Sequence, residues 1–201
     1  MELIKTFFFL FAVIDPFGTI PVYMEATKHF DARHRRMVAL RAPIMAFFIL
    51  LFFIVVGQII MESMEISLNA FQVSGGVVLF LFALTMIFGE GKPESEKHLI
   101  GDYKRTTIFP IAIPSLASPG AIMAVVLLTD NHIYSFTQQA VTAILTLGVL
   151  VVSGLLMLAA QQVQKRIGES GITVISKVMG LILASYAVQS ILTGLKAFFA
   201  E

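Results

Sequence analysis

Six apolar stretches, each long enough to cross a lipid bilayer as a helix, occupy most of this chain. A helix needs roughly 20 apolar residues to cross a hydrocarbon core about 30 Å thick, and helices satisfy their own backbone hydrogen bonds there. The stretches run approximately from Leu3 to Tyr23, Ala42 to Ile60, Asn69 to Gly89, Thr107 to Leu128, Ala140 to Ala160 and Ile172 to Leu195. The sequence therefore predicts an all-α polytopic membrane protein in which residues 1–201 form a single membrane domain.

Composition excludes several other classes of protein. Hydrophobic residues make up 57% of the 201 residues and charged residues 13%, which leaves too little polar surface to cover six apolar helices in water. The formal net charge of +1 provides no basic surplus for phosphate backbones, so we expect no nucleic-acid partner. The absence of cysteine excludes disulfides and thiolate chemistry. Asp15 interrupts the first apolar run and no cleavage-like site follows it, so we interpret this run as an uncleaved first helix.

Lysine and arginine gather in alternate loops, and short cytoplasmic loops carry the excess of these residues in membrane proteins. The loops and helix ends at 25–41, 91–106 and 161–171 hold eleven of them, whereas the opposite loops at 61–67 and 130–137 hold none. The eleven are Lys28, Arg33, Arg35, Arg36, Arg41, Lys92, Lys97, Lys104, Arg105, Lys165 and Arg166. We therefore expect a multi-pass membrane protein with both termini extracytoplasmic.

The two halves of the chain match at an offset of about one hundred residues, as expected of an internal repeat. The segment from Asp15 to Ile20 corresponds to the segment from Ser118 to Ile122, and Gly76 corresponds to Gly180. Because each half has three helices, the second half must begin on the opposite side of the membrane. We predict two inverted three-helix repeats, at about 3–89 and 107–198, joined by a cytoplasmic loop at about 90–106.

Proline follows a helix-capping residue inside both the first and the fourth span, at Asp15-Pro16 and Ser118-Pro119. Proline removes a backbone donor and clashes with the preceding turn, and Asp or Ser before Pro is typical of a helix start. We therefore predict that helices 1 and 4 are broken at Pro into half-helices. Their positively polarised N-termini would face the membrane interior and attract anionic groups. The alternative is a simple kink repaired by neighbouring hydroxyls.

Asp15 adds to this prediction, because an acid deep in a span costs several kcal/mol and such residues tend to mark ion or substrate pathways. It could carry a proton, or its ionised form could help to bind a cation, and the sequence leaves both open. Gly18 and Gly120 would allow a backbone or small ligand to come close. Gln72 and Gln189, on the third helix of each half, are predicted to line the same cavity. The candidate substrate- or ion-binding residues are Asp15, Pro16, Phe17, Gly18, Gln72, Ser115, Ser118, Pro119, Gly120 and Gln189.

Two segments, IDPFGTIPVYMEAT at 14–27 and AIPSLASPGAI at 112–122, resemble the signature segments of the MarC family. GGVVLFLFALTMIFG in the third helix and KVMGLILASYAVQSILTG in the sixth also resemble that family, so the likeness covers nearly the whole chain. The resemblance implies a six-helix protein of the inner (plasma) membrane of a bacterium. It also implies kinship to a neutral amino acid transporter family and, more distantly, to amino acid exporters. Ser115 and Ser118 stand where the family's second segment usually has Leu and Gly.

The leading hypothesis is a secondary transporter of small neutral amino acids, such as glycine, alanine or serine, or of similar small solutes. No Walker A motif is present, so the driving force would be the solute's own gradient or an ion gradient, with a proton as the first hypothesis. A non-transporting membrane protein and a small-metabolite exporter are the alternatives. We expect no enzyme, cofactor or metal, because metalloprotease spacing of histidines and a pair of membrane carboxylates are both missing. The expected partners are a small neutral solute, a proton and membrane lipids.

Overall fold

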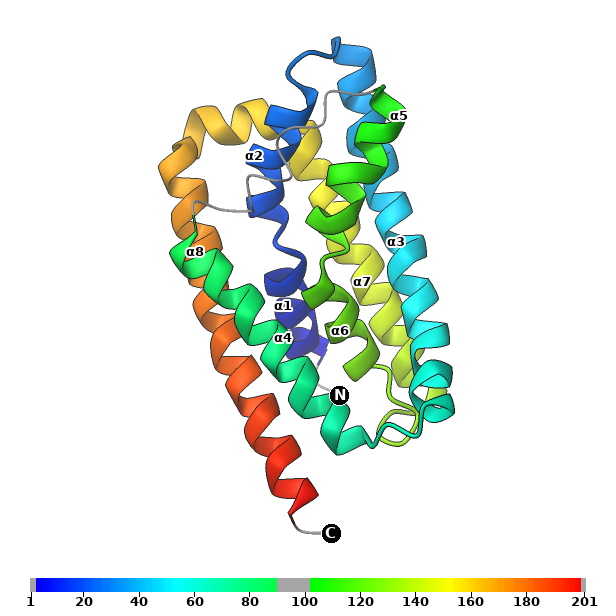
Figure 1. Cartoon of the computed structure of the whole chain (residues 1–201). Coiled ribbons are helices and arrows are strands. Elements are labelled where there is room, and N and C mark those ends of the chain that lie inside the picture. Colours follow the sequence, from blue (N-terminus) through cyan, green and yellow to red (C-terminus); the bar gives the residue numbers. More distant parts are fainter. Residues whose placement is uncertain (1–2, 90–101, 200–201) are drawn as a thin grey trace.

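Each predicted span is helical in the computed structural model, which describes residues 3–89 and 102–199 (Figure 1). The first half contains α1 (Leu3–Ile14), α2 (Pro16–Thr27), α3 (Ala32–Ser63) and α4 (Leu68–Phe88). The second half contains α5 (Tyr103–Thr106), η2 (Thr107–Leu116), α6 (Pro119–Leu127), α7 (Phe136–Leu158) and α8 (Ala160–Phe198). No strand occurs in these two described ranges. Most of the predicted loop at about 90–106 lies outside the described residues.

In the part of the chain that the structure describes, five helices are long and apolar enough to cross a membrane, and α1 with α2 counts as one of them. A sixth span results if the bent pair Tyr103–Leu116 and Pro119–Leu127 is taken as one. The two parts of that pair meet at an angle of 56°. The predicted all-α membrane fold is thus confirmed, with five or six candidate spans.

The first span breaks at Asp15, where the backbone adopts φ 49° and ψ 69°. Proline at position 16 cannot continue the hydrogen bonding of α1, and α2 begins at that proline. The left-handed conformation disfavours most side chains, but aspartate tolerates it because its short side chain hydrogen-bonds locally. The predicted break in helix 1 is therefore present, with Asp15 as the single residue between α1 and α2.

The fourth span is irregular over the whole of η2. Phe109 (φ −129°, ψ 122°) and Ile113 (φ −128°, ψ 130°) leave helical geometry. Each precedes a proline, whose ring disfavours the helical region for the residue before it. A regular helix resumes only at Pro119, after Ala117 and Ser118. The predicted break in helix 4 is present at Ser118-Pro119, and the span also leaves helical geometry before two prolines further upstream, Pro110 and Pro114.

The region between the fifth and sixth predicted spans is helical, and the prediction of a loop there is wrong. α8 starts at Ala160, directly after α7, and bends at Gly168, whose φ of +74° favours glycine. The segment before the bend lies across one end of the bundle, and the long segment after it descends alongside α4 (Figure 1). Val163 packs against the core while most of its neighbours are exposed. This segment is thus an amphipathic helix that contacts the bundle through one apolar face.

α4 and α8 pack together closely through two glycines. A Cβ on Gly76 would lie 3.0 Å from the carbonyl oxygen of Ala187, and a Cβ on Gly180 would lie 3.2 Å from that of Ala83. Small residues allow such backbone approach between membrane helices. The same register relates Gly76 to Gly180 and Ala83 to Ala187, so the contact is reciprocal. A twofold relation between the halves would produce this reciprocity, although inverted repeats remain a prediction.

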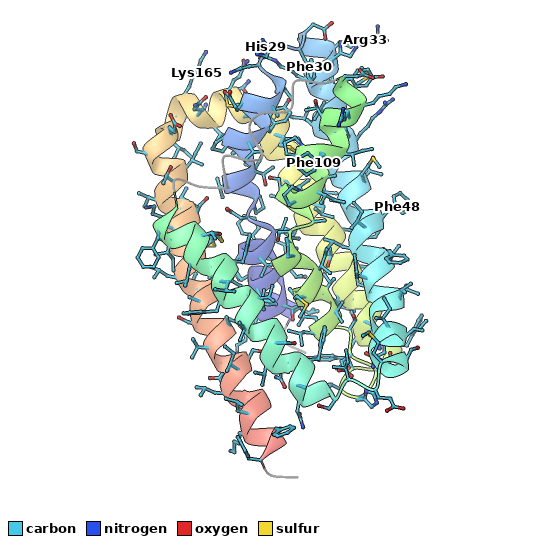
Figure 2. All side chains as sticks on the ribbon, in the orientation of Figure 1. His29, Phe30, Arg33, Phe48, Phe109 and Lys165 are labelled. Carbon is cyan, nitrogen blue, oxygen red and sulfur yellow. The ribbon has the colours of Figure 1, made fainter. Side chains whose placement is uncertain are left out.

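The ends of the bundle differ in charge. α1 begins and α8 ends at one end, while the end of α2, the start of α3 and the bend of α8 share the opposite end (Figure 1). Arg33 and Lys165 lie at that opposite end, as Figure 2 shows. The helices thus place both termini on the side away from the basic loops that the structure describes, and the direction of this axis in a membrane stays a prediction.

Candidate functional site

The start of α2 is built by Asp15. Its carboxylate oxygen Oδ1 accepts a hydrogen bond from the backbone N–H of Gly18 at 3.0 Å, which is the usual cap of a helix N-terminus. Its carbonyl oxygen accepts the hydroxyl of Thr19 at 3.1 Å. The side chain is 2% exposed, although it sits midway along an apolar span. An acidic side chain therefore lies in the interior, where the backbone N–H of Gly18 donates to its carboxylate.

Gly18 gives this carboxylate its space. A Cβ at that position would overlap Oδ2 of Asp15 and would lie 3.1 Å from Oγ of Ser176. No side chain larger than hydrogen fits while the cap is in place. The close approach predicted for Gly18 is thus to the aspartate carboxylate and to a serine from another helix.

Ser176 connects the distant α8 to this helix start. Its hydroxyl donates to Oδ1 of Asp15 at 3.2 Å, across 161 residues of sequence. Ser176 is 4% exposed and belongs to the buried stripe of α8. The same carboxylate oxygen therefore accepts one hydrogen bond from α2 and one from α8. A shift of α8 relative to α2 would remove the second of these hydrogen bonds.

The second half-helix, α6, begins in the same way. The hydroxyl oxygen of Ser118 accepts the backbone N–H of Ala121 at 3.0 Å, and Pro119 occupies the first helical position. Ser118 is buried, whereas Pro119 is exposed. A Cβ on Gly120 would lie 3.0 Å from the ring of Phe82, so Gly120 provides room for a side chain of α4.

The two broken spans meet through hydroxyl groups. Ser115 of η2 donates to the hydroxyl oxygen of Thr19 at 3.4 Å, and Thr19 in turn donates to the carbonyl of Asp15. Both hydroxyl residues are fully buried. We call Asp15, Thr19, Ser115 and Ser176 the central polar cluster. Its hydrogen bonds join α2, η2 and α8 where the first span restarts as a helix, and Ser118, which caps α6, follows Ser115 by three residues.

Not every predicted site residue reaches this cluster. Phe17 is half-buried, with its ring edge toward Phe11 at a centroid distance of 6.2 Å. Gln72 is half-buried on α4, and its backbone carbonyl accepts the hydroxyl of Ser190 at 3.3 Å. Gln189 is exposed and its side chain donates to Thr193 on the same helix at 3.2 Å. The prediction that Gln72 and Gln189 line one cavity is therefore corrected, because Gln189 lies off the buried stripe of α8.

Thr19 and Ser176 are the cluster residues that the sequence analysis did not select. A signal for Ser176 exists in the periodicity of α8, whose buried positions recur every three or four residues and include it. The register that pairs Gly76 with Gly180 also places Ser176 opposite Gln72. Lys177 follows Ser176 directly and is half-buried, so a lysine lies at nearly the same depth as the carboxylate.

The cluster can offer both polarities to a small ligand. Two helix N-termini bring partial positive charge, and one carboxylate with several hydroxyls brings acceptors and neutral donors. Within residues 3–89 and 102–199, no group of three or more His, Asp or Glu side chains could hold a metal ion.

The family model described as "MarC family integral membrane protein" matches residues 1–199. The chain belongs to the MarC family. Among MarC relatives, the UPF0056 membrane protein MJ1677 of Methanocaldococcus jannaschii is 34% identical over 198 residues, covering 96% of this chain and 95% of its own. The UPF0056 inner membrane protein YhgN of Escherichia coli K12 is 28% identical, covering 97% and 96%. No solved structure matches this MarC protein. It is an integral membrane protein, and the names of these relatives state no substrate.

Proposed function

We propose that this MarC-family protein is a secondary transporter of small neutral amino acids, such as glycine, alanine or serine, in the inner membrane. Asp15 would act in proton coupling or in recognition of the substrate amine. The observation that carries the proposal is an aspartate only 2% exposed, placed where a broken span restarts, whose carboxylate accepts the hydroxyl of Ser176 from the distant α8.

The free-energy cost of placing an acidic side chain inside a membrane span supports a functional role for Asp15. Insertion scales put an aspartate at the centre of a membrane helix at roughly 2.5 to 3.5 kcal/mol. Asn or Ser would cap α2 about as well, and the equivalent position before α6 does use Ser118. Capping alone therefore gives no reason to keep the acid, whereas a proton or an amine does.

The neighbouring groups support a small, polar and neutral solute. Thr19, Ser115, Ser118 and Ser176 provide hydroxyls, which can donate or accept without adding charge. A zwitterionic amino acid could direct its carboxylate to a helix N-terminus and its ammonium to Asp15, so that each charge has a partner. The size of the ligand is limited because every residue of the cluster is buried.

The cluster is closed in this conformation, so transport requires rearrangement that opens it to each side in turn. Its contacts come from the two broken spans and from α8, which packs on α4. Rocking of one set of helices against the other around a fixed central site is the usual form of alternating access. The 3.4 Å hydroxyl contact between Ser115 and Thr19 is one link between the broken spans that such a motion would break.

Ligand-dependent stabilisation tests the proposal directly, since a ligand that binds the folded state raises its unfolding midpoint. We expect at least one of glycine, alanine and serine to raise the midpoint of the wild-type protein in detergent. Ser176→Ala should reduce that shift. Ser153→Ala is the matched control, because the hydroxyl of Ser153 is buried but donates only within α7, to Val149 at 2.9 Å. Absence of a shift with all three amino acids would contradict the proposed substrate class.

A further inference from the structure

A polar cavity of about 700 Å³ opens at the end of the bundle that carries the basic loops. It lies between the end of α2, the start of α3 and the junction of α7 with α8. Three basic residues, Lys28, Arg35 and Arg36, line it together with Gln161 and Gln162. We call it the basic cavity. Its lining favours an anionic group with several acceptor oxygens.

Hydrogen bonds between α2 and α3 fix the wall of the basic cavity. Arg35 donates through Nε to the carbonyl of Thr27 at 3.0 Å and through Nη2 to the carbonyl of Lys28 at 2.6 Å. Tyr23 donates its hydroxyl to the carbonyl of Arg35 at 3.0 Å. Arg35 therefore shapes the cavity, while the exposed Arg36 is a lining arginine that can be replaced without removing these bonds.

A second hollow continues from the first along the side of the bundle. This α3–α7 groove has a volume of about 300 Å³ and is almost entirely apolar. Leu158 lines both the basic cavity and the groove, so the two are adjacent. From Leu158 to Leu147 the groove extends about 16 Å along α7, at 1.5 Å per residue. Pro43 of α3 and Gly154 of α7 line its middle.

We propose that the basic cavity and the α3–α7 groove together bind one anionic phospholipid. The phosphate occupies the basic cavity beside Arg36, and an acyl chain occupies the groove. The division of the lining into a basic end and an apolar channel matches the division of a phospholipid into headgroup and chain. Basic recesses between membrane helices at the cytoplasmic face are suited to anionic headgroups. The site is separate from the central polar cluster and does not depend on the proposed transport function.

The ligand is a lipid rather than free phosphate, because the apolar lining of the groove offers a free anion no partner but can hold an acyl chain. The two ligands therefore differ in which of the two hollows they need. A lipid needs both the arginine and the open groove, whereas inorganic phosphate needs only the basic cavity. A variant that fills the groove therefore distinguishes them, and Val151, which is 52% exposed and lines the groove, is suited to this substitution.

The test uses the full-length protein, purified in detergent and exposed to an equimolar mixture of phosphatidylglycerol and phosphatidylcholine, with retained lipid counted by native mass spectrometry. Wild type should retain phosphatidylglycerol preferentially. Arg36→Gln should lower that retention about fivefold, and Val151→Trp should also lower it. Arg33→Gln is the matched control, an exposed arginine of the same helix end that does not line the basic cavity, and it should behave as wild type.

Circular dichroism of each variant checks that the bundle is intact before retention is compared. Equal retention by wild type, Arg36→Gln and Val151→Trp would overturn the proposal. It would also be overturned if Arg36→Gln lost phosphatidylglycerol while Val151→Trp retained it as wild type does, because the basic cavity would then bind a phosphate group without help from the groove. Neither outcome bears on amino acid binding at Asp15.

Discussion

Replacing Asp15 by alanine and by asparagine distinguishes the contribution of its hydrogen bonds to stability from that of its charge. Alanine removes the cap on the Gly18 N–H, which costs about 1 kcal/mol. It also leaves the Ser176 hydroxyl without its acceptor, for about 1 kcal/mol more. The backbone at φ 49° adds roughly 1 kcal/mol, because alanine disfavours the left-handed region. Both variants also remove the cost of burying the charge, so the losses are compared between them: we expect the free energy of unfolding of Asp15→Ala to be about 3 kcal/mol lower than that of Asp15→Asn.

Asparagine keeps an acceptor oxygen for both donors and tolerates the left-handed backbone, so Asp15→Asn should cost less than about 1 kcal/mol. The assay is reversible unfolding in mixed micelles, followed by circular dichroism because the chain contains no tryptophan. Asp31→Ala is the matched control, an exposed cap whose carboxylate accepts the His34 N–H at 2.8 Å. It should destabilise the protein less than Asp15→Ala does, because only a cap in solvent is lost. Equal losses for the two Asp15 variants would refute the reasoning, because the fold would then require the charge itself.

Three further predictions follow from the geometry. Gly18→Ala places a Cβ on the carboxylate of Asp15 and should lower the free energy of unfolding by about 2 kcal/mol. In the same unfolding assay Gly148→Ala is the control: its Cβ meets no atom within 4 Å, so it should raise the free energy of unfolding by about 0.5 kcal/mol. The His34 backbone N–H, and then its side chain, lower the pKa of Asp31 below its ordinary value of 3.8, so this carboxylate stabilises the fold above that pH. The stabilisation should disappear as pH falls further, and thermal melting of wild type and Asp31→Asn should then converge; a difference that grows with acid would contradict the cap. A reporter fused at the C-terminus should lie outside the cytoplasm, and reporter activity in the cytoplasm would contradict the predicted topology.

Hydropathy and proline chemistry were enough to predict the spans and both breaks. Apolar length decides where a helix can cross a membrane, and Pro16 and Pro119 act on the backbone wherever the chain places them. Local rules of this kind need no knowledge of neighbouring helices. The same is true of the caps, since Asp15 and Ser118 bond to N–H groups only three residues away.

The partners across helices could not be predicted in the same way. Ser176 reaches Asp15 only because α8 packs with a particular face inward, and that face depends on the contact of Gly180 with α4. Gln189 is equally polar but lies on the outer face, so residue type alone misplaced it. The helical segment before Gly168 was missed because its charged residues resemble those of a loop, while a single apolar face holds it to the bundle.

The central claim is that Asp15 couples or recognises a small neutral amino acid, and uptake into proteoliposomes tests it most directly. Labelled glycine, alanine and serine are offered with and without an imposed proton gradient to wild type and to Asp15→Asn. The account predicts gradient-dependent uptake by wild type that Asp15→Asn abolishes while its circular dichroism stays unchanged. Uptake by neither protein above that of empty vesicles, or equal uptake by both, would contradict it.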